Sequence, residues 1–260
     1  MTHDTEIAAL HDRAGVATVE IYPALGSTMD RARELAADAT AALPALVLAD
    51  RQTAGHGRRG ARWWQAEGSL AVSIVLDDRV VGVPVQPTWS PACGVALAEA
   101  IVAVEPTVDP RVKWPNDLEV DGRKLAGILL ETAAVGRTVL GIGVNTTGHG
   151  AAAPPPLRGR LTTLPDLTGR SLSRSDLLIE FLPRFLKLVQ EMHDSPEVLL
   201  DRYRVRCGLT GRPVTVYRGD EQIEGICAGI AIDGSLVVDA ASGRQWITSG
   251  SLTAPAHERG

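Results

Sequence analysis

The chain has 260 residues, 45% of them hydrophobic, which is enough to bury a sizeable core in one large domain or two unequal ones. Its formal net charge of −5 gives no general attraction to polyanions, which argues against a nucleic-acid-binding protein. The three cysteines form no CxxC pair, so a reduced protein without structural zinc is expected. The charged N-terminal stretch is unlike a signal peptide, and no apolar run approaches the roughly 18 residues of a membrane span. We therefore expect a cytoplasmic protein.

The first part of the chain predicts two helices with two strands between them. The spacing of Ser27 and Asp30 is that of a capping box, so a helix should begin there. Short apolar runs at 45–50 and 69–76 predict buried strands. A Ser-Pro pair then starts a buried helix over about 90–104.

The middle of the chain predicts a hairpin, two further strands and a loop. The stretch 119–124, "EVDGRK", has Asp-Gly at its centre, which is the strongest local signal of a hairpin turn. The apolar stretches 125–133 and 137–146 predict the next strands. Residues 148–160 have no periodicity and contain three consecutive prolines, so they predict a surface loop.

A long amphipathic helix and a β-rich tail complete the chain. Ser173 is the expected helix cap, and both phenylalanines, Phe181 and Phe185, lie four apart on one face. Pro183 within this helix should bend or break it. After about residue 208, three or four short β runs separated by Gly-containing turns predict a small barrel or meander.

The stretch 51–64, "RQTAGHGRRGARWW", combines three glycines with four basic residues. Backbone N–H groups and guanidinium forks in such a loop suit phosphate or carboxylate oxygens. The spacing is neither that of a P-loop nor that of a dinucleotide fingerprint. A solvated basic turn remains the alternative interpretation. The basic residues are His56, Arg58, Arg59 and Arg62.

The chain contains three lysines against 23 arginines, and two of the lysines, Lys113 and Lys124, lie within eleven residues of each other. A lysine ammonium is a compact charge on a long stem, so it can follow oxygens that move during a reaction. We therefore expect these lysines to contact a carboxylate and a phosphate that become joined. Asn116 and Asp117 between them could bind a nucleotide and a Mg²⁺ ion. A hairpin with exposed lysines is the alternative.

Five motifs follow one another along the chain: GSTMD, RQTAGHGRRGARWW, VKWPNDL, GRKLAGILLE and GIGVN. In this combination and order they resemble the biotin protein ligase family, and the similarity extends over nearly the whole chain. The resemblance implies an α+β fold with a mixed-sheet catalytic domain of the biotin/lipoate ligase type at 1–208 and a small SH3-like β-barrel domain at 209–260. It points to the monofunctional class, because the residues before the first motif are too few for a winged-helix DNA-binding domain.

The resemblance implies an enzyme that joins biotin to ATP, giving biotinyl-5′-AMP and pyrophosphate. The biotinyl group then passes to a lysine of the biotin carboxyl carrier domain of a carboxylase such as acetyl-CoA carboxylase. ATP, Mg²⁺ and biotin are the expected substrates and activating ion, with no tightly bound prosthetic group, no DNA partner and no membrane. Monomer and homodimer both stay open. A lipoate–protein ligase and a non-catalytic biotin- or carrier-binding module are the alternatives.

The same resemblance assigns expected roles to individual residues, with Lys124 and Arg58 as the catalytic pair. The expected biotin-binding residues are Ser27, Thr28, Gln52, Gly55, His56, Arg58, Trp63, Lys124 and Gly127. The expected ATP- and AMP-binding residues are Arg58, Arg59, Lys113, Asn116 and Asn145, with Asp117 as the candidate Mg²⁺ ligand.

Two residues depart from the family pattern. His56 stands where many members have arginine, and histidine is mostly neutral at pH 7, so one fixed positive charge is less certain. Met29 replaces a frequent asparagine and lacks its hydrogen-bonding groups. The basic loop itself should be mobile without anions, because few apolar contacts hold it, and should order over a bound adenylate.

Overall fold

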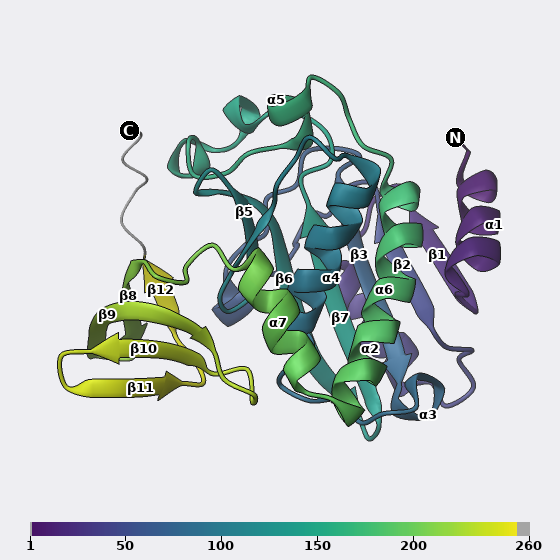
Figure 1. Ribbon diagram of the computed structural model, residues 1–260. Coiled ribbons are helices and arrows are strands. Elements are labelled where there is room, and N and C mark those ends of the chain that lie inside the picture. The colour runs from purple at the N-terminus through teal and green to yellow at the C-terminus, as the bar shows by residue number, and fades with distance from the viewer. Residues whose placement is uncertain (1, 254–260) are drawn as a thin grey trace.

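The computed structural model describes residues 2–253, and its larger sheet has seven strands in the order β1-β2-β3-β7-β6-β5-β4 (Figure 1). β1 and β2 run parallel, whereas every other neighbouring pair is antiparallel, so the sheet is mixed. The strands are β1 Thr18–Tyr22, β2 Ala45–Ala49, β3 Leu70–Asp77, β4 Arg111–Lys113, β5 Asp117–Val120, β6 Arg123–Ala134 and β7 Arg137–Val144.

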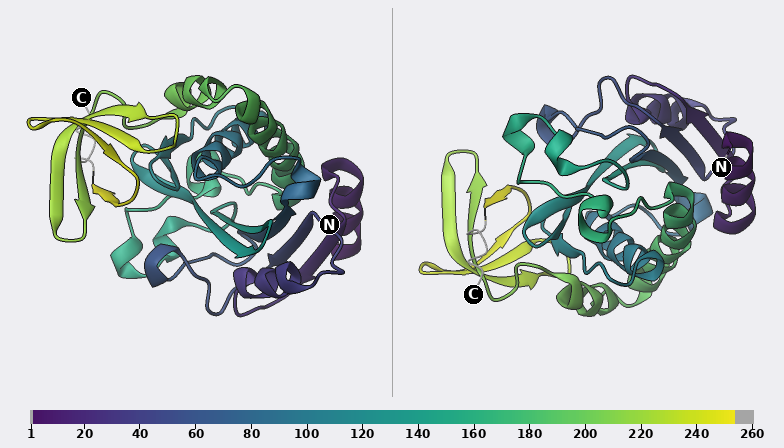
Figure 2. Two further views of the ribbon diagram at one scale, coloured as in Figure 1. Left: turned by 90° about the horizontal axis from the view of Figure 1, so that it is seen from below. Right: turned by 90° about the horizontal axis from the view of Figure 1, so that it is seen from above.

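Helices cover both faces of this sheet (Figure 2). α4 (Trp89–Val104) and α6 (Arg174–Asp194) pack on one face, and α2 (Thr28–Ala37) packs on the other. The alternation along β7 follows this division, because Leu140 and Ile142 join the cluster of α4 and α6 while Val139 joins that of α2. The remaining helices are α1 His3–Ala14, α3 Asp78–Val81, α5 Leu164–Thr168, α7 Glu197–Arg206, and the 3₁₀ turns η1 Arg58–Gly60, η2 Gly150–Ala152 and η3 Pro155–Leu157.

The aromatic residues of α6 anchor it against α4. Phe181 and Phe185 stack with ring centroids 5.7 Å apart, and Trp89 meets Phe185 edge-on at 5.8 Å. The helix is continuous through Pro183, so a break at the proline is wrong. The apolar face is buried on both sides of Pro183, and this packing offsets the backbone hydrogen bond that proline removes.

The predicted cap of α6 is confirmed, since Ser173 Oγ accepts a hydrogen bond from the Asp176 N–H at 3.3 Å. Ser173→Ala should lower the free energy of unfolding by about 1 kcal/mol, because the helix loses that acceptor. Urea unfolding measures the difference. Ser171→Ala is the matched control, because Ser171 is exposed and precedes the helix. Equal losses in both variants would contradict the capping role.

The C-terminal strands form a separate antiparallel sheet of five strands in the order β11-β10-β9-β8-β12. Three or four strands were predicted here. The α+β fold class, with a mixed sheet followed by a small β unit, is confirmed. The last residues of the predicted second domain, 254–260, lie outside the described residues, and the boundary at 208 stays a prediction. The strands are β8 Pro213–Arg218, β9 Glu221–Ile230, β10 Leu236–Ala240, β11 Gly243–Ile247 and β12 Ser251–Thr253.

Trp114 connects the two sheets. It belongs to the hydrophobic cluster of the C-terminal sheet, and its Nε1 donates to the Gly234 carbonyl at 3.2 Å. The predicted hairpin is confirmed nearby, with Asp121 at φ 51° and Gly122 at φ 72°, the backbone of an Asp-Gly turn. Within residues 2–253, no helix is long and apolar enough to cross a bilayer.

Candidate functional site

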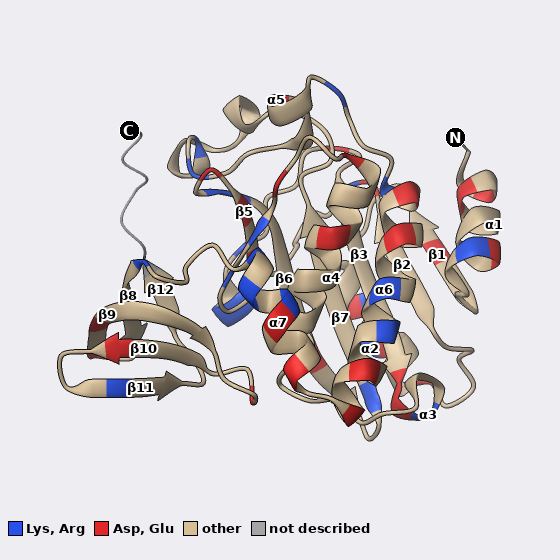
Figure 3. Cartoon of the chain, in the orientation of Figure 1, with Lys and Arg blue, Asp and Glu red and all other residues tan. Residues whose placement is uncertain are grey.

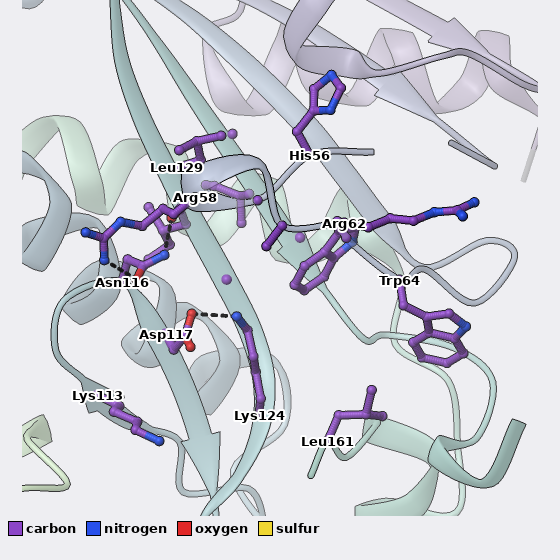
Figure 4. Close-up of a pocket in the computed structure, with 18 of the residues that line it drawn as sticks. His56, Arg58, Arg62, Trp64, Lys113, Asn116, Asp117, Lys124, Leu129 and Leu161 are labelled. Carbon is purple, nitrogen blue, oxygen red and sulfur yellow. Dashed lines mark hydrogen bonds and ion pairs between the residues drawn. The ribbon is translucent and has the colours of Figure 1, made fainter. Parts of the chain in front are cut away.

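A cavity of about 740 Å³ opens on the α2 face of the large sheet, a size typical of a ligand site (Figure 4). Twelve of the fourteen predicted site residues line it. Ser27 and Gly55 do not line the cavity. Ser27 is buried as the N-cap of α2, and Gly55 is buried against the Gln52 side chain. The lining residues are Thr28, Gln52, His56, Arg58, Arg59, Trp63, Lys113, Asn116, Asp117, Lys124, Gly127 and Asn145. Their individual roles stay predictions.

The floor of the cavity is made of glycines. Gly127 of β6 lies opposite Gly143 of β7, and the Trp63 ring rests on both. A Cβ at position 143 would stand 2.4 Å from Trp63 Cε2, so only glycine leaves room for the ring. Trp63 Nε1 is buried without a hydrogen-bond partner among the described residues. A bound ligand with an acceptor at this point would satisfy that donor.

One end of the cavity is polar and rigid. Gln52 Oε1 accepts from the backbone N–H of Thr28 at 2.8 Å and from its hydroxyl at 3.2 Å. Ser73 Oγ donates to Thr28 Oγ1 at 2.8 Å. These bonds hold the Gln52 amide at the N-terminus of α2. This end can therefore offer oriented donors and acceptors to a small polar group.

Lys124 lies at the centre of the site. Its Nζ is 2.7 Å from Asp117 Oδ1 (Figure 4) and lies over the Trp63 ring, 5.5 Å from the ring centroid. The backbone of Lys124 pairs with the long loop, because its N–H donates to the Arg160 carbonyl at 3.0 Å and its carbonyl accepts from Thr162 at 2.9 Å. The segment predicted only as a surface loop thus forms one wall of the cavity.

Lys113 is paired separately, with its Nζ 2.6 Å from Glu119 Oε1. Burial raises the pKa of Glu119, and the hydrogen bond from Lys113 opposes that shift. Each cavity lysine therefore has a carboxylate on β5 as its partner. Among residues 2–253, the lining arginines have no such carboxylate partner, so they remain available to an anionic ligand. These arginines are Arg58, Arg59, Arg62 and Arg160.

Arg58 reaches across the cavity from the glycine-rich loop. Its Nη1 donates to Asn116 Oδ1 at 3.0 Å, and Asn116 Nδ2 donates to the Ile128 carbonyl at 2.7 Å. Burial lowers the pKa of Arg58, and the neighbouring charge of Arg59 adds to the effect. A bound anion would relieve both costs. Asn116 thus holds the Arg58 side chain at the cavity, where it can pair with an anionic ligand.

His56 lines the cavity but does not point its ring into it. The ring extends away from Lys124, and Nε2 lies 3.2 Å from Asp30 Oδ2 on α2 (Figure 4). Asp30 therefore does not complete the predicted capping box, because its carboxylate binds His56 and Arg33 instead. Ser27 caps the helix without it, accepting from the Met29 N–H at 3.3 Å.

Some of the lining residues were missed from the sequence. Arg160 ends the loop without periodicity and Leu161 follows it, while 250–252 lie at the start of β12 in the C-terminal sheet. No local pattern marks these residues, because their place depends on the pairing of the loop with Lys124 and on the docking of the small sheet. Met29 was noted as a departure, and its Sδ packs where a Cβ of Gly141 would otherwise stand.

The cavity can bind a Mg²⁺ ion only together with a ligand that supplies further oxygen atoms, such as phosphate oxygens. No cluster of three or more potential metal-binding side chains occurs in the part of the chain that the structure describes. Asp117 and Glu119 are the cavity carboxylates, and both are engaged by lysines. Since Mg²⁺ commonly binds one or two carboxylates together with substrate phosphates, Asp117 could take part in such a shared site.

Charge on the surface gathers around the same region. Basic residues lie on β4, at the start of β6 and on the adjoining loop, whereas acidic and basic residues are interspersed on the helices of the opposite face (Figure 3). The cavity lining holds six arginines and lysines against two carboxylates. An overall acidic chain therefore presents a locally cationic pocket, which suits a small anion better than a long polyanion.

Known proteins resemble the chain in sequence. Residues 23–146 match the biotin/lipoate A/B protein ligase family, and residues 209–251 match the biotin protein ligase C-terminal domain. A biotin–[acetyl-CoA-carboxylase] ligase from Mycobacterium tuberculosis is 33% identical over 215 residues, covering 80% of this chain and 77% of that protein. One from Paracoccus denitrificans is 30% identical over 224 residues, covering 80% of this chain and 89% of that protein.

A solved structure shares the fold. The biotin protein ligase from Aquifex aeolicus, in complex with biotin and ATP, superposes with a TM-score of 0.80. The match covers 92% of this chain and 99% of that one at 24% sequence identity. The similarity therefore extends through both sheets.

Proposed function

The chain belongs to the biotin/lipoate A/B protein ligase family, and we propose that it works as an ATP-dependent biotin–protein ligase. It activates biotin as biotinyl-5′-AMP and transfers the biotinyl group to a lysine of a carboxylase carrier domain. One observation carries the proposal: the cations of two motifs far apart in the chain, 51–64 and 113–131, line a single cavity with a glycine floor. This arrangement can bring two acidic ligands together.

In the first step, a biotin carboxylate oxygen attacks the α-phosphorus of ATP. The new bond is the acyl–phosphate linkage, and the bond from the α-phosphorus to the bridging oxygen breaks, releasing pyrophosphate. The two reactants are anions that repel each other, so Lys124 and the arginines of the cavity lining reduce the barrier by screening that repulsion. Lys124 would leave Asp117 to follow the carboxylate oxygen as it bonds. A Mg²⁺ ion arriving with ATP would screen the phosphate charges.

In the second step, the amine of the carrier lysine attacks the acyl carbon of the adenylate. AMP leaves with the electron pair of the acyl–oxygen bond, and the amine loses a proton as the amide forms. The Gln52 amide, which Thr28 holds in place, and the Trp63 ring above the glycine floor would position the biotinyl group during this exchange. The partner is therefore a carrier domain of a biotin-dependent carboxylase, and acetyl-CoA carboxylase is the one named by the relatives.

The proposal is tested by incubating the chain with ATP, Mg²⁺, biotin and a carrier domain. We expect pyrophosphate release that depends on biotin and a mass increase of the carrier by one biotinyl group. Replacing biotin by lipoate should give neither signal. Turnover with lipoate alone would favour a lipoate ligase, and ligand binding without pyrophosphate release would favour a non-catalytic module.

We also propose that the chain divides into a catalytic domain at 1–208 and an SH3-like domain from 209 onward. Support comes from the separate hydrophobic cluster of the small sheet and from the C-terminal family match that begins at 209. A cytoplasmic location agrees with three cysteines that form no disulfide. Cell fractionation tests the location, and limited proteolysis near residue 208 tests the boundary.

A further inference from the structure

The glycine-rich loop carries one ion pair that the proposed reaction does not use. We call residues 55–62 the lid. His56 Nε2 lies 3.2 Å from Asp30 Oδ2, so the lid contacts the first turn of α2 at this point. Both side chains are partly exposed, with 40% and 52% of their surface accessible to solvent. The contact is therefore accessible to protons and belongs to the outer edge of the lid.

The Asp30 carboxylate is held in place by its neighbours. Arg33 donates to Asp30 Oδ1, which leaves Oδ2 for His56. Arg33 is itself fixed from β6, since Glu131 Oε2 lies 3.0 Å from its Nε and 2.9 Å from its Nη2. The sheet, α2 and the lid are thus joined by one continuous chain of charged groups.

The lid has few other attachments. It closes on itself, with the Gly57 N–H donating to the Ala61 carbonyl at 2.6 Å and the Trp63 N–H to the Gly55 carbonyl at 2.9 Å. On the cavity side, Arg58 reaches Asn116. Arg62 Nη2 also donates to the Thr53 carbonyl at 3.4 Å, next to the start of the lid. The contacts of the lid with other elements are therefore Arg58 with Asn116 on the inner side and His56 with Asp30 on the outer side.

We propose that Asp30 is a positioning residue that holds the lid closed through His56, and that this hold weakens as the imidazole loses its proton. The inference rests on the proposed function, because the closed lid would retain the reactive adenylate. An imidazolium binds a carboxylate more strongly than a neutral imidazole does. Histidine changes charge between about pH 5 and 8, whereas an aspartate stays ionised in this range.

Charged groups of both signs surround His56. The carboxylates are Asp30 of α2 and, one step further, Glu131 of β6. The cations are Arg33 of α2 and the lid arginines, including Arg62, which pairs with His56 across the lid backbone. Among the described residues, Asp30 is the carboxylate within ion-pair distance of the ring, so the attachment is strongest when the imidazole is charged. The lid should be held more firmly at pH 6 than at pH 8.

The first test uses the ligand-free protein and needs no activity. Amide hydrogen exchange of residues 55–62 is measured at pH 6 and pH 8, and each rate is divided by the intrinsic rate at that pH. We expect protection to be about two- to fivefold greater at pH 6, the range that an exposed ion pair supports. Asp30→Asn should remove the difference. Protection that is equal at both pH values in the native chain would overturn the proposal.

The second test follows release of biotinyl-5′-AMP formed in the active site. Release should be two- to fivefold faster at pH 8 than at pH 6 in the native chain, and equally fast at both in Asp30→Asn. His56→Arg should restore slow release at both values, because arginine keeps its charge. Glu34→Gln is the matched control on α2, since Glu34 binds Arg31 rather than the lid, and should keep the native profile. An Asp30→Asn profile like that of the native chain would overturn the proposal, whereas failure to form any adenylate would count against the proposed function alone.

Discussion

Replacing Lys124 with alanine should lower the rate of adenylate formation by about 100- to 1,000-fold, the usual loss when one charge-stabilising donor is removed from an active site. The ammonium lies 2.7 Å from Asp117 Oδ1 (Figure 4) and 5.5 Å from the centroid of the Trp63 ring. Without it, only the arginines and any Mg²⁺ screen the biotin carboxylate from the phosphate, and the negative charge of Asp117 adds to the repulsion. Biotin-dependent release of pyrophosphate measures the rate.

The third lysine provides the control for this experiment. Lys187 lies on α6 with 75% of its side chain exposed, and its nearest carboxylate is Glu191 at 3.6 Å. Lys187→Ala should keep native turnover. Thermal unfolding of Lys124→Ala should show that its fold survives. Turnover of Lys124→Ala within a few-fold of the native value would refute the assigned role.

Most residues of the site could be predicted from the sequence because they lie within short motifs. The glycine-rich loop and the KWPND hairpin each hold their own geometry: glycines permit the loop, and the Asp-Gly turn brings Lys124 back beside Asp117 on the neighbouring strand. That the two motifs share one cavity followed from the family resemblance, because no spacing rule connects residue 58 with residue 116. The sheet order that joins them is a tertiary property.

Other elements were missed for local reasons. α1, β1 and α7 were not predicted. α1 and α7 bury only three and two residues respectively, so their apolar pattern is weak, and α1 is recognised in the structure by its Thr2 cap and by its packing near α6. β1 alternates between polar and apolar residues, but the pattern is only five residues long, and the strand is intermediate in burial along its whole length.

The electrostatic organisation of the cavity also depended on the fold. The lysines looked like free cations in the sequence, yet both are neutralised by β5 carboxylates, whereas Arg160 is exposed at the cavity wall without such a partner among the described residues. Pairing of the loop with the backbone of Lys124 brings Arg160 there. Whether a lysine or arginine is free to bind a ligand depends on which carboxylates the fold places beside it. The composition of the chain does not contain that information.

Gly143 is the position where a single methyl group should do most damage to the floor of the site. An added Cβ would stand 2.4 Å from Cε2 and Cζ2 of the Trp63 ring, closer than non-bonded atoms approach, so the ring must leave the floor. Displacing a positioning group by about 1 Å costs about 100-fold in catalysis, so kcat/KM for biotin should fall by about that factor in Gly143→Ala. Steady-state pyrophosphate release at varied biotin concentration measures it.

Two comparisons separate this clash from a general disturbance of β7. Gly141→Ala lies two residues earlier on the same face, but its Cβ meets the flexible thioether of Met29, with Sδ at 2.6 Å, which can rotate aside. Its loss should be several-fold smaller than that of Gly143→Ala. In a Trp63→Ala background the clash no longer exists, so adding Gly143→Ala should cause little further loss, whereas an undiminished second loss would mean that the ring is not what the glycine accommodates.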